Sequence, residues 1–214
     1  MLEQVLSVFT KLGGSLAGRG ADWALEQLKQ LKRPRIELKR APENVFSHLP
    51  PGTSLARVRE VLGTPHREDA GFYSFRFSDA LIQVGPNDRE SVESISVVIP
   101  QLGRRTRFPV YPLPLVLGKA TLGDVLKLDP EAQIKKEFSS KYWCFWTESY
   151  FGFPGLYRHY LFGVMEAPCA QPPEFEWDHE NERLKSDPNT VRVNWAAVSA
   201  NQGAAETFNF WAFV

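Results

Sequence analysis

The sequence predicts an α+β fold in which two tandem modules, each a helix followed by an antiparallel meander, form a broad sheet preceded by N-terminal helices. Segments 53–58 and 120–125 begin a helix in the same way, with Ser54 corresponding to Thr121 and Val58 to Val125. An aromatic-rich stretch of alternating pattern follows each segment. A helix and a half-buried sheet cover each other's apolar surfaces, so this repetition indicates one packed unit used twice.

The chain of 214 residues is long enough to bury a sizeable core without a metal or a disulfide. Shifts in composition predict four regions. They are the N-terminal helices with a basic connector (1–50), the first module (51–100), a proline-rich linker (101–118) and a larger second module (119–214).

In the N-terminal region, apolar residues recur at helical spacing over 2–12 and again over 23–31, with glycines between the two runs. Pro34 ends the second run, because proline lacks the N–H that a helix needs. Such amphipathic helices pack on the sheet, pack on a second subunit or lie on a membrane surface, and the sequence leaves these three readings open.

In the first module, Thr53 or Ser54 is a suitable N-cap, and Gly63 and Pro65 end a helix of about two turns. Alternation over 72–78, an apolar run over 81–84 and a further alternation over 91–99 predict three antiparallel strands. The periodic apolar positions expected in the core are Leu55, Val58, Leu62, Phe75 and Phe77.

In the second module, Thr121 and Asp124 form a variant of the capping box. The segment 166–190, which is rich in prolines and acidic residues, is predicted to be a long loop. Strands are expected near 132–139, 142–150, 156–165, 191–199 and 206–213.

The formal net charge is zero, so there is no overall basic field for nucleic acid. Residues 166–187 nevertheless carry seven acidic and two basic side chains, an excess suited to a basic partner. Cys144 and Cys169 form no C-x-x-C pair, so neither a zinc site nor a redox motif is indicated, and a buried thiol or a single disulfide would both fit.

No catalytic signature is found: nucleophile-elbow, zincin and phosphate-loop motifs are all missing from the sequence. Only His179 lies among carboxylates, and neighbouring residues of a loop seldom converge on an ion. We therefore expect no catalytic residues, no cofactor and no metal. With no secretion signal, no lipid-attachment cysteine near the start and no membrane span in the sequence, the expected location is the cytoplasm.

Ten of the 21 residues from Tyr142 to Phe162 are aromatic. If 142–146 is a strand, both of its faces carry rings, and one core hides only one face. The other face must be covered by the N-terminal helices, by the other module or by a partner. A hairpin tip is predicted over 149–156, and its rings would be unfavourable in water unless a partner covers them.

The segment 51–65, PGTSLARVREVLGTP, followed by an aromatic strand, resembles the opening of the small helix-plus-meander domains of the SmpA/OmlA lipoprotein family. In tandem, the unit resembles the beta-lactamase inhibitory protein fold. The chain differs from both in lacking a signal peptide and a lipid-attachment cysteine. What the resemblance implies is the architecture, and small cytoplasmic proteins built this way resemble the immunity proteins that neutralise bacterial toxins.

These patterns predict a non-enzymatic protein-binding module, an immunity-type inhibitor that occludes the active site of a bacterial toxin. The alternatives are an adaptor that uses the N-terminal helices and a small-ligand-binding protein or enzyme with a pocket formed by Trp143, Trp146, Tyr157 and His159. Removing residues 1–33 would abolish binding by an adaptor only. The expected partner-binding residues are Trp143, Trp146, Tyr150, Phe151, Phe153, Tyr157, Glu174, Glu176, Asp178, Glu180 and Glu182.

Overall fold

A computed structural model describes residues 39–69, 71–103, 106–203, 206 and 208–213. The predicted N-terminal helices fall within residues 1–38 and therefore lie outside the described residues. The described residues belong to one compact unit that begins at Leu38. Residues 39–50, which the sequence grouped with the N-terminal helices, pack into the core of this unit through Ala41, Val45, Phe46 and Leu49.

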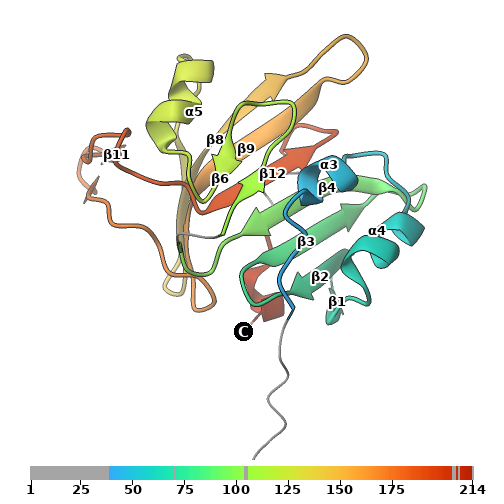
Figure 1. Cartoon of the computed structure of the whole chain (residues 1–214). Coiled ribbons are helices and arrows are strands. Elements are labelled where there is room, and N and C mark those ends of the chain that lie inside the picture. Colours follow the sequence, from blue (N-terminus) through green and yellow to red (C-terminus); the bar gives the residue numbers. More distant parts are fainter. Residues whose placement is uncertain (1–38, 70, 104–105, 204–205, 207, 214) are drawn as a thin grey trace, which may run out of the picture. The chain divides into compact units, whose positions relative to one another are not determined.

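The unit is built on one antiparallel sheet of eight strands, in the order β1-β2-β3-β4-β12-β9-β8-β7 (Figure 1). The strand β12, from the C-terminal part of the chain, pairs with both β4 and β9 and joins the two halves. The predicted α+β class with a broad antiparallel sheet is therefore confirmed. The strands are β1 (Arg67–Asp69), β2 (Phe72–Arg76), β3 (Leu81–Pro86), β4 (Val92–Val98), β7 (Lys135–Phe138), β8 (Trp143–Phe151), β9 (Arg158–Glu166) and β12 (Trp195–Ser199).

Two of the helices begin at the predicted caps. The helix α4 (Leu55–Leu62) starts where the Ser54 hydroxyl accepts a 3.3 Å hydrogen bond from the Arg57 N–H, and it ends at Gly63 with φ 88°. Before α5 (Leu122–Leu128), the Thr121 hydroxyl accepts from the Asp124 N–H, and the Asp124 carboxylate accepts from the Thr121 N–H. Both caps pair N–H groups that the first helical turn leaves without partners.

One face of the sheet, the helix face, is covered by α4, α5 and the short helix α3 (Val45–His48). Val58, Leu62 and Phe75 are buried there as predicted, whereas Leu55 and Phe77 are half-buried and pack against the same cluster. The segment 101–118 pairs with itself as β5 (Phe108–Pro109) and β6 (Val116–Leu117). It connects the two halves, and it also fills the core with Phe108, Val110 and Leu117.

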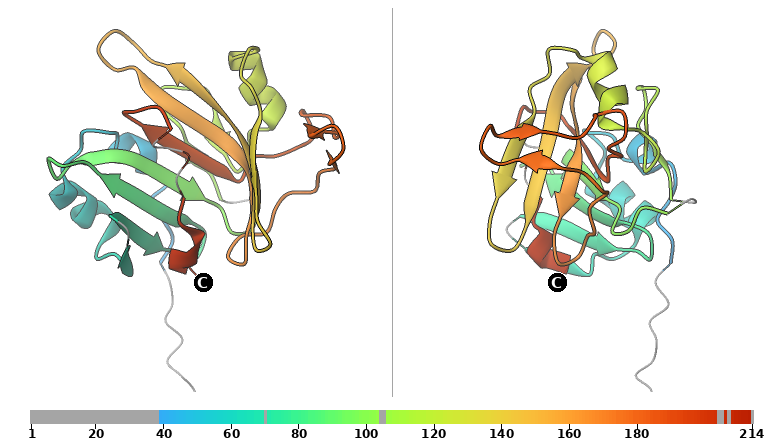
Figure 2. Two further views of the ribbon diagram at one scale, coloured as in Figure 1. Left: turned by 180° about the vertical axis from the view of Figure 1, so that it is seen from behind. Right: turned by 90° about the vertical axis from the view of Figure 1, so that its left-hand side faces the viewer.

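The opposite face, which we call the C-terminal face, is covered by residues 208–213. The predicted strand over 206–213 is wrong: the segment ends in a 3-10 helix, η1 (Phe210–Phe213), beside β2 (Figure 2). Side chains of the sheet hold it, because Gln83 accepts a hydrogen bond from the Asn209 N–H at 3.0 Å and Arg76 donates to the Phe213 carbonyl at 3.1 Å. Alternating rings suggested a strand, but this segment packs across the sheet instead of joining its edge.

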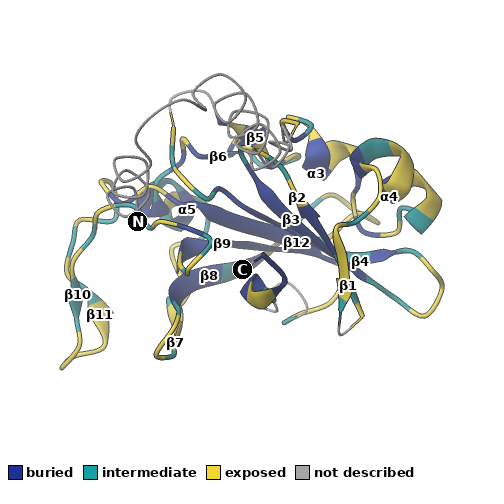
Figure 3. Ribbon diagram, turned by 90° about the horizontal axis from the view of Figure 1, so that it is seen from below, coloured by how far each residue is buried: buried dark blue, intermediate teal, exposed yellow. Residues whose placement is uncertain are grey.

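Both aromatic faces of the first half of β8 are covered by the chain itself. On the helix face, Trp143 and Phe145 pack against Phe175 and Trp177 from the acidic segment. On the C-terminal face, Trp146 packs against Trp195 and residues of the C-terminal segment. Neither cover was predicted. The acidic segment is also not a plain loop, because it contains the hairpin β10 (Trp177–Asp178) and β11 (Arg183–Leu184), which is mostly exposed in Figure 3.

Candidate functional site

The predicted aromatic site divides into buried and exposed parts. Trp143 and Trp146 are 9 % and 6 % exposed, and they face opposite sides of β8. The predicted pocket of Trp143, Trp146, Tyr157 and His159 is therefore not formed, because no single cavity can contact both sides of one strand. Phe151 is half-buried and packs on the helix-face core.

The remaining rings lie at the tip of the β8–β9 hairpin, which extends beyond the neighbouring strands in Figure 1. Four large apolar side chains are solvent-exposed there: Tyr150 by 59 %, Phe153 by 57 %, Leu156 by 61 % and Tyr157 by 42 %. Gly152 enters the tip with φ 154°, and a Cβ there would lie 2.5 Å from the Leu156 carbonyl oxygen. The sequence correctly placed a turn here.

The hairpin of β10 and β11, which we call the acidic hairpin, lies at the other end of β8. Trp177 of β10 packs 5.2 Å from Trp143 at the start of β8, whereas Tyr150 is seven residues further along the strand, roughly 24 Å away. Three of the five acidic residues that were predicted to bind a partner form ion pairs within the chain. These are Glu176 with Lys185 (3.4 Å), Asp178 with Arg183 (3.6 Å) and Glu182 with Lys136 (2.6 Å), while Glu174 and Glu180 are exposed.

A network of charged side chains, centred on Glu148 and Lys135, lies on the C-terminal face between the hairpin tip and the centre of the sheet. Glu148, whose side chain is only 4 % exposed, accepts from Lys135 Nζ at 3.2 Å and from the Gly203 N–H at 3.1 Å, and it lies 3.2 Å from His159 Nδ1. Lys135 also pairs with Glu206. Burial by itself would raise the pKa of Glu148, but these hydrogen bonds outweigh burial and lower that pKa.

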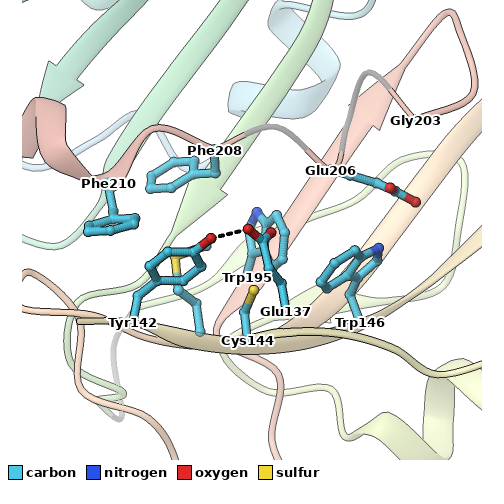
Figure 4. Close-up of a pocket in the computed structure, with 10 residues that line it drawn as sticks. Glu137, Tyr142, Cys144, Trp146, Trp195, Gly203, Glu206, Phe208 and Phe210 are labelled. Carbon is cyan, nitrogen blue, oxygen red and sulfur yellow. Dashed lines mark hydrogen bonds between the residues drawn. The ribbon is translucent and has the colours of Figure 1, made fainter. Parts of the chain in front are cut away.

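A cavity of about 360 Å³ opens beside this network, between the C-terminal face and the C-terminal segment (Figure 4). The Tyr142 hydroxyl donates a hydrogen bond to the Glu137 carboxylate. Burial and this bond raise the pKa of Tyr142 to about 12. The cavity is lined by Glu137, Tyr142, Cys144, Trp146, Met165, Trp195, Gly203, Glu206, Phe208 and Phe210.

The thiol at this cavity is suited to packing and not to nucleophilic chemistry. Burial, followed by the charge of Glu137, raises the pKa of Cys144 to about 12, so the thiol stays protonated at neutral pH. Cys169 is also a free thiol, and burial raises its pKa too. The disulfide that the sequence left open is therefore not formed.

The sequence interpretation missed most of this cavity. Its walls come from β7, β8, β9, β12 and the C-terminal segment, and only Trp146 was among the predicted site residues. The available signal was the alternation of Phe208 and Phe210, which was read as a strand. Within the described residues, no group of three His, Cys, Asp or Glu side chains is placed to hold a metal ion.

No known protein family, curated protein or solved structure matches this chain. Among the described helices, none is long and apolar enough to cross a membrane.

Proposed function

We propose that this chain is a non-enzymatic protein-binding module that contacts its partner through the tip of the β8–β9 hairpin. The observation that carries the proposal is the exposure of Tyr150, Phe153, Leu156 and Tyr157, each by 42 % or more, on one tip. Large apolar side chains gathered on a surface mark interaction sites, and tyrosines are enriched among the residues that dominate binding energy.

The tip is also partly preorganised. The Tyr150 ring stacks on Tyr157 with centroids 5.2 Å apart, and it lies 4.7 Å from the His159 ring. The His159 Nδ1 lies in turn 3.2 Å from the Glu148 carboxylate. Rings that are already ordered lose less conformational freedom on binding, so more of the contact energy contributes to affinity.

The specific form we propose is an immunity-type inhibitor that acts in the bacterial cytoplasm and occludes the active site of a toxin. A protruding hairpin with an apolar tip has a shape that can enter a concave site. The proposal includes two tandem modules, which resemble the beta-lactamase inhibitory protein and SmpA/OmlA folds. The order of elements supports the two modules, because α4 precedes β1–β4 and α5 precedes β7–β9.

We propose a smaller role in binding for the acidic hairpin. Because it lies roughly 24 Å from the tip along β8, only a partner large enough to span β8 touches both. Glu174 and Glu180 would then steer a basic partner during association, whereas Glu176, Asp178 and Glu182 already have cationic neighbours. The adaptor alternative depends on residues 1–33, which lie outside the described residues.

A photo-reactive amino acid at position 153, introduced into the full chain in its native cell, tests whether the tip meets a partner. The matched control carries the same group at Tyr111, another aromatic residue that is 68 % exposed. We expect a discrete cross-linked protein with position 153 only. Equal cross-linking from both positions would contradict a specific tip interface.

With the cross-linked protein purified, the pair Tyr150→Ser and Phe153→Ser should weaken binding at least about thirtyfold, the effect of losing one hot-spot ring. Tyr111→Ser should bind as the parent does. An immunity-type inhibitor should also suppress the activity of its partner and restore growth of cells that express it. Binding without inhibition would favour the adaptor, which removal of residues 1–33 would then disable.

A further inference from the structure

The cavity on the C-terminal face contains an unpaired hydrogen-bond donor. Trp146 is 94 % buried, and its indole Nε1 has no hydrogen-bond partner among the described residues. The other tryptophan of the cavity, Trp195, donates to the Ser96 hydroxyl at 2.8 Å. Buried donors in folded proteins are nearly always paired, so the Trp146 N–H, which has no acceptor among the described residues, is available to a guest that carries one.

The cavity walls favour a flat aromatic guest. Rings of Tyr142, Trp146, Trp195, Phe208 and Phe210 line it, together with the two sulfur atoms of Cys144 and Met165. Aromatic faces and polarizable sulfur both make favourable contacts with a planar ring. A volume of about 360 Å³ lies within the range of small-molecule sites.

The polar groups of the cavity favour a guest that also donates hydrogen bonds. The carboxylates of Glu137 and Glu206 both line the cavity, and in Figure 4 the Trp146 nitrogen points to the side on which Glu206 lies. Glu137 already accepts from Tyr142, and Glu206 already contacts Lys135 and the Glu148 carboxylate. A carboxylate has about four acceptor positions, so each can take another donor.

We propose that this cavity binds a small heteroaromatic amine, a planar ring in which a nitrogen acceptor stands next to an amino group. The ring nitrogen accepts the Trp146 indole N–H, and the neighbouring amino group donates to the carboxylate of Glu206. The proposal is independent of the hairpin tip, because none of the exposed tip residues lines the cavity.

Adenine is a suitable probe, because a ring nitrogen and an amino group stand side by side on its six-membered ring. Titrated into the full chain labelled with ¹⁵N, it should shift the Trp146 indole N–H resonance downfield and saturably, with a Kd below about 1 mM. That resonance is assigned by its loss in Trp146→Phe, a variant that keeps an aromatic ring and removes the unpaired donor. The indole resonance of Trp177, on the helix face, should not move.

Two comparisons test the chemistry. Purine, which lacks the amino group, should bind at least about fivefold more weakly, the loss of roughly one hydrogen bond. Trp146→Phe should weaken adenine binding, whereas Trp177→Phe should not. The proposal is overturned by a titration without a saturable shift, by equal shifts of all the indoles, by equal binding of purine, or by unchanged affinity in Trp146→Phe. Binding that is lost in Tyr150→Ser as well would overturn its independence from the tip.

Discussion

Trp146 and Trp195 meet edge to face across Gly163, with their ring centroids 5.7 Å apart. Gly163 pairs with Trp195 on one side and with Trp146 on the other, so the two indoles lie in one row of the sheet. A Cβ at Gly163 would collide with the Phe145 carbonyl oxygen and with the Cα and Cβ of Trp146, which position the Trp146 ring. The absence of a Cβ at this position therefore allows the floor of the cavity to form.

Gly163→Ala should lower the free energy of unfolding by about 1–3 kcal/mol, the usual cost of overpacking a well-packed interior. The added Cβ would lie 2.4 Å from the Phe145 carbonyl oxygen and 2.7 Å from the Trp146 Cβ. Urea unfolding followed by circular dichroism measures the change. Gly103→Ala is the control, because the nearest atom to a Cβ there is 3.9 Å away. Equal stability of the two variants would contradict the close approach at Gly163.

Two adjacent lysines of β7 should differ in their contribution to stability. Lys135→Met removes the lysine partner of Glu148, whose side chain is 4 % exposed, so it should cost about 1–3 kcal/mol. Lys136→Met removes a partner of Glu182, which is 68 % exposed, so it should change stability by less than about 0.5 kcal/mol. Urea unfolding at neutral pH measures both. Similar values for the two variants would mean that solvent screens Glu148.

The contribution of Lys135 should also depend on pH. Its pKa is raised above 10.5 by the bonds to Glu206 and Glu148, and the pKa of Glu148 is lowered below 4.5. The pair therefore stabilises the fold between these values. Its contribution is lost as the pH falls through the folded-state pKa of Glu148 or rises through that of Lys135. The difference between parent and Lys135→Met, measured by urea unfolding across this range, should shrink at both extremes, and a difference constant with pH would refute the pairing.

The capping box of α5 should stabilise the fold above about pH 4 and lose its effect in acid. Hydrogen bonds from the Thr121 N–H and hydroxyl lower the pKa of Asp124 below 3.8, so its contribution is present above 3.8 and declines as the pH falls through the folded-state pKa. Asp124→Ala should cost about 1 kcal/mol at neutral pH, as loss of a cap does, and less in acid. Thermal unfolding of Asp124→Ala is compared with that of the control Asp88→Ala, because Asp88 lies in an exposed turn. A cost independent of pH would show that the Asp124 charge has no role.

Cys144 should resist alkylation while the protein is folded. With its pKa raised to about 12, only about one thiol in 10,000 is ionised at pH 8, and the thiol is also buried. Iodoacetamide labelling followed by mass spectrometry should modify Cys144 only after unfolding in urea. Rapid labelling in the native state would show that the cavity floor opens. The variant Cys169→Ser leaves Cys144 as the only thiol and makes the signal unambiguous.

The sequence by itself determined the local structure. Ser54 with Gly63, and Thr121 with Asp124, set the bounds of two helices, because capping depends on side chains within one turn of the backbone they bind. The alternation in β2 and β4 predicted those strands, because successive side chains of a strand face opposite sides. The glycines and the proline after Phe151 placed the exposed tip for the same local reason.

Only the tertiary structure decided which residues meet. The pairing of β12 with β4 and β9, and the covering of Trp146 by the C-terminal segment, join residues up to about 100 positions apart in the chain. No periodicity encodes such contacts, because a period describes which face a residue takes and not what covers that face. For this reason the rings of β8 were predicted, whereas the burial of Trp143 and Trp146, the 3-10 helix at Phe210 and the cavity between them were not.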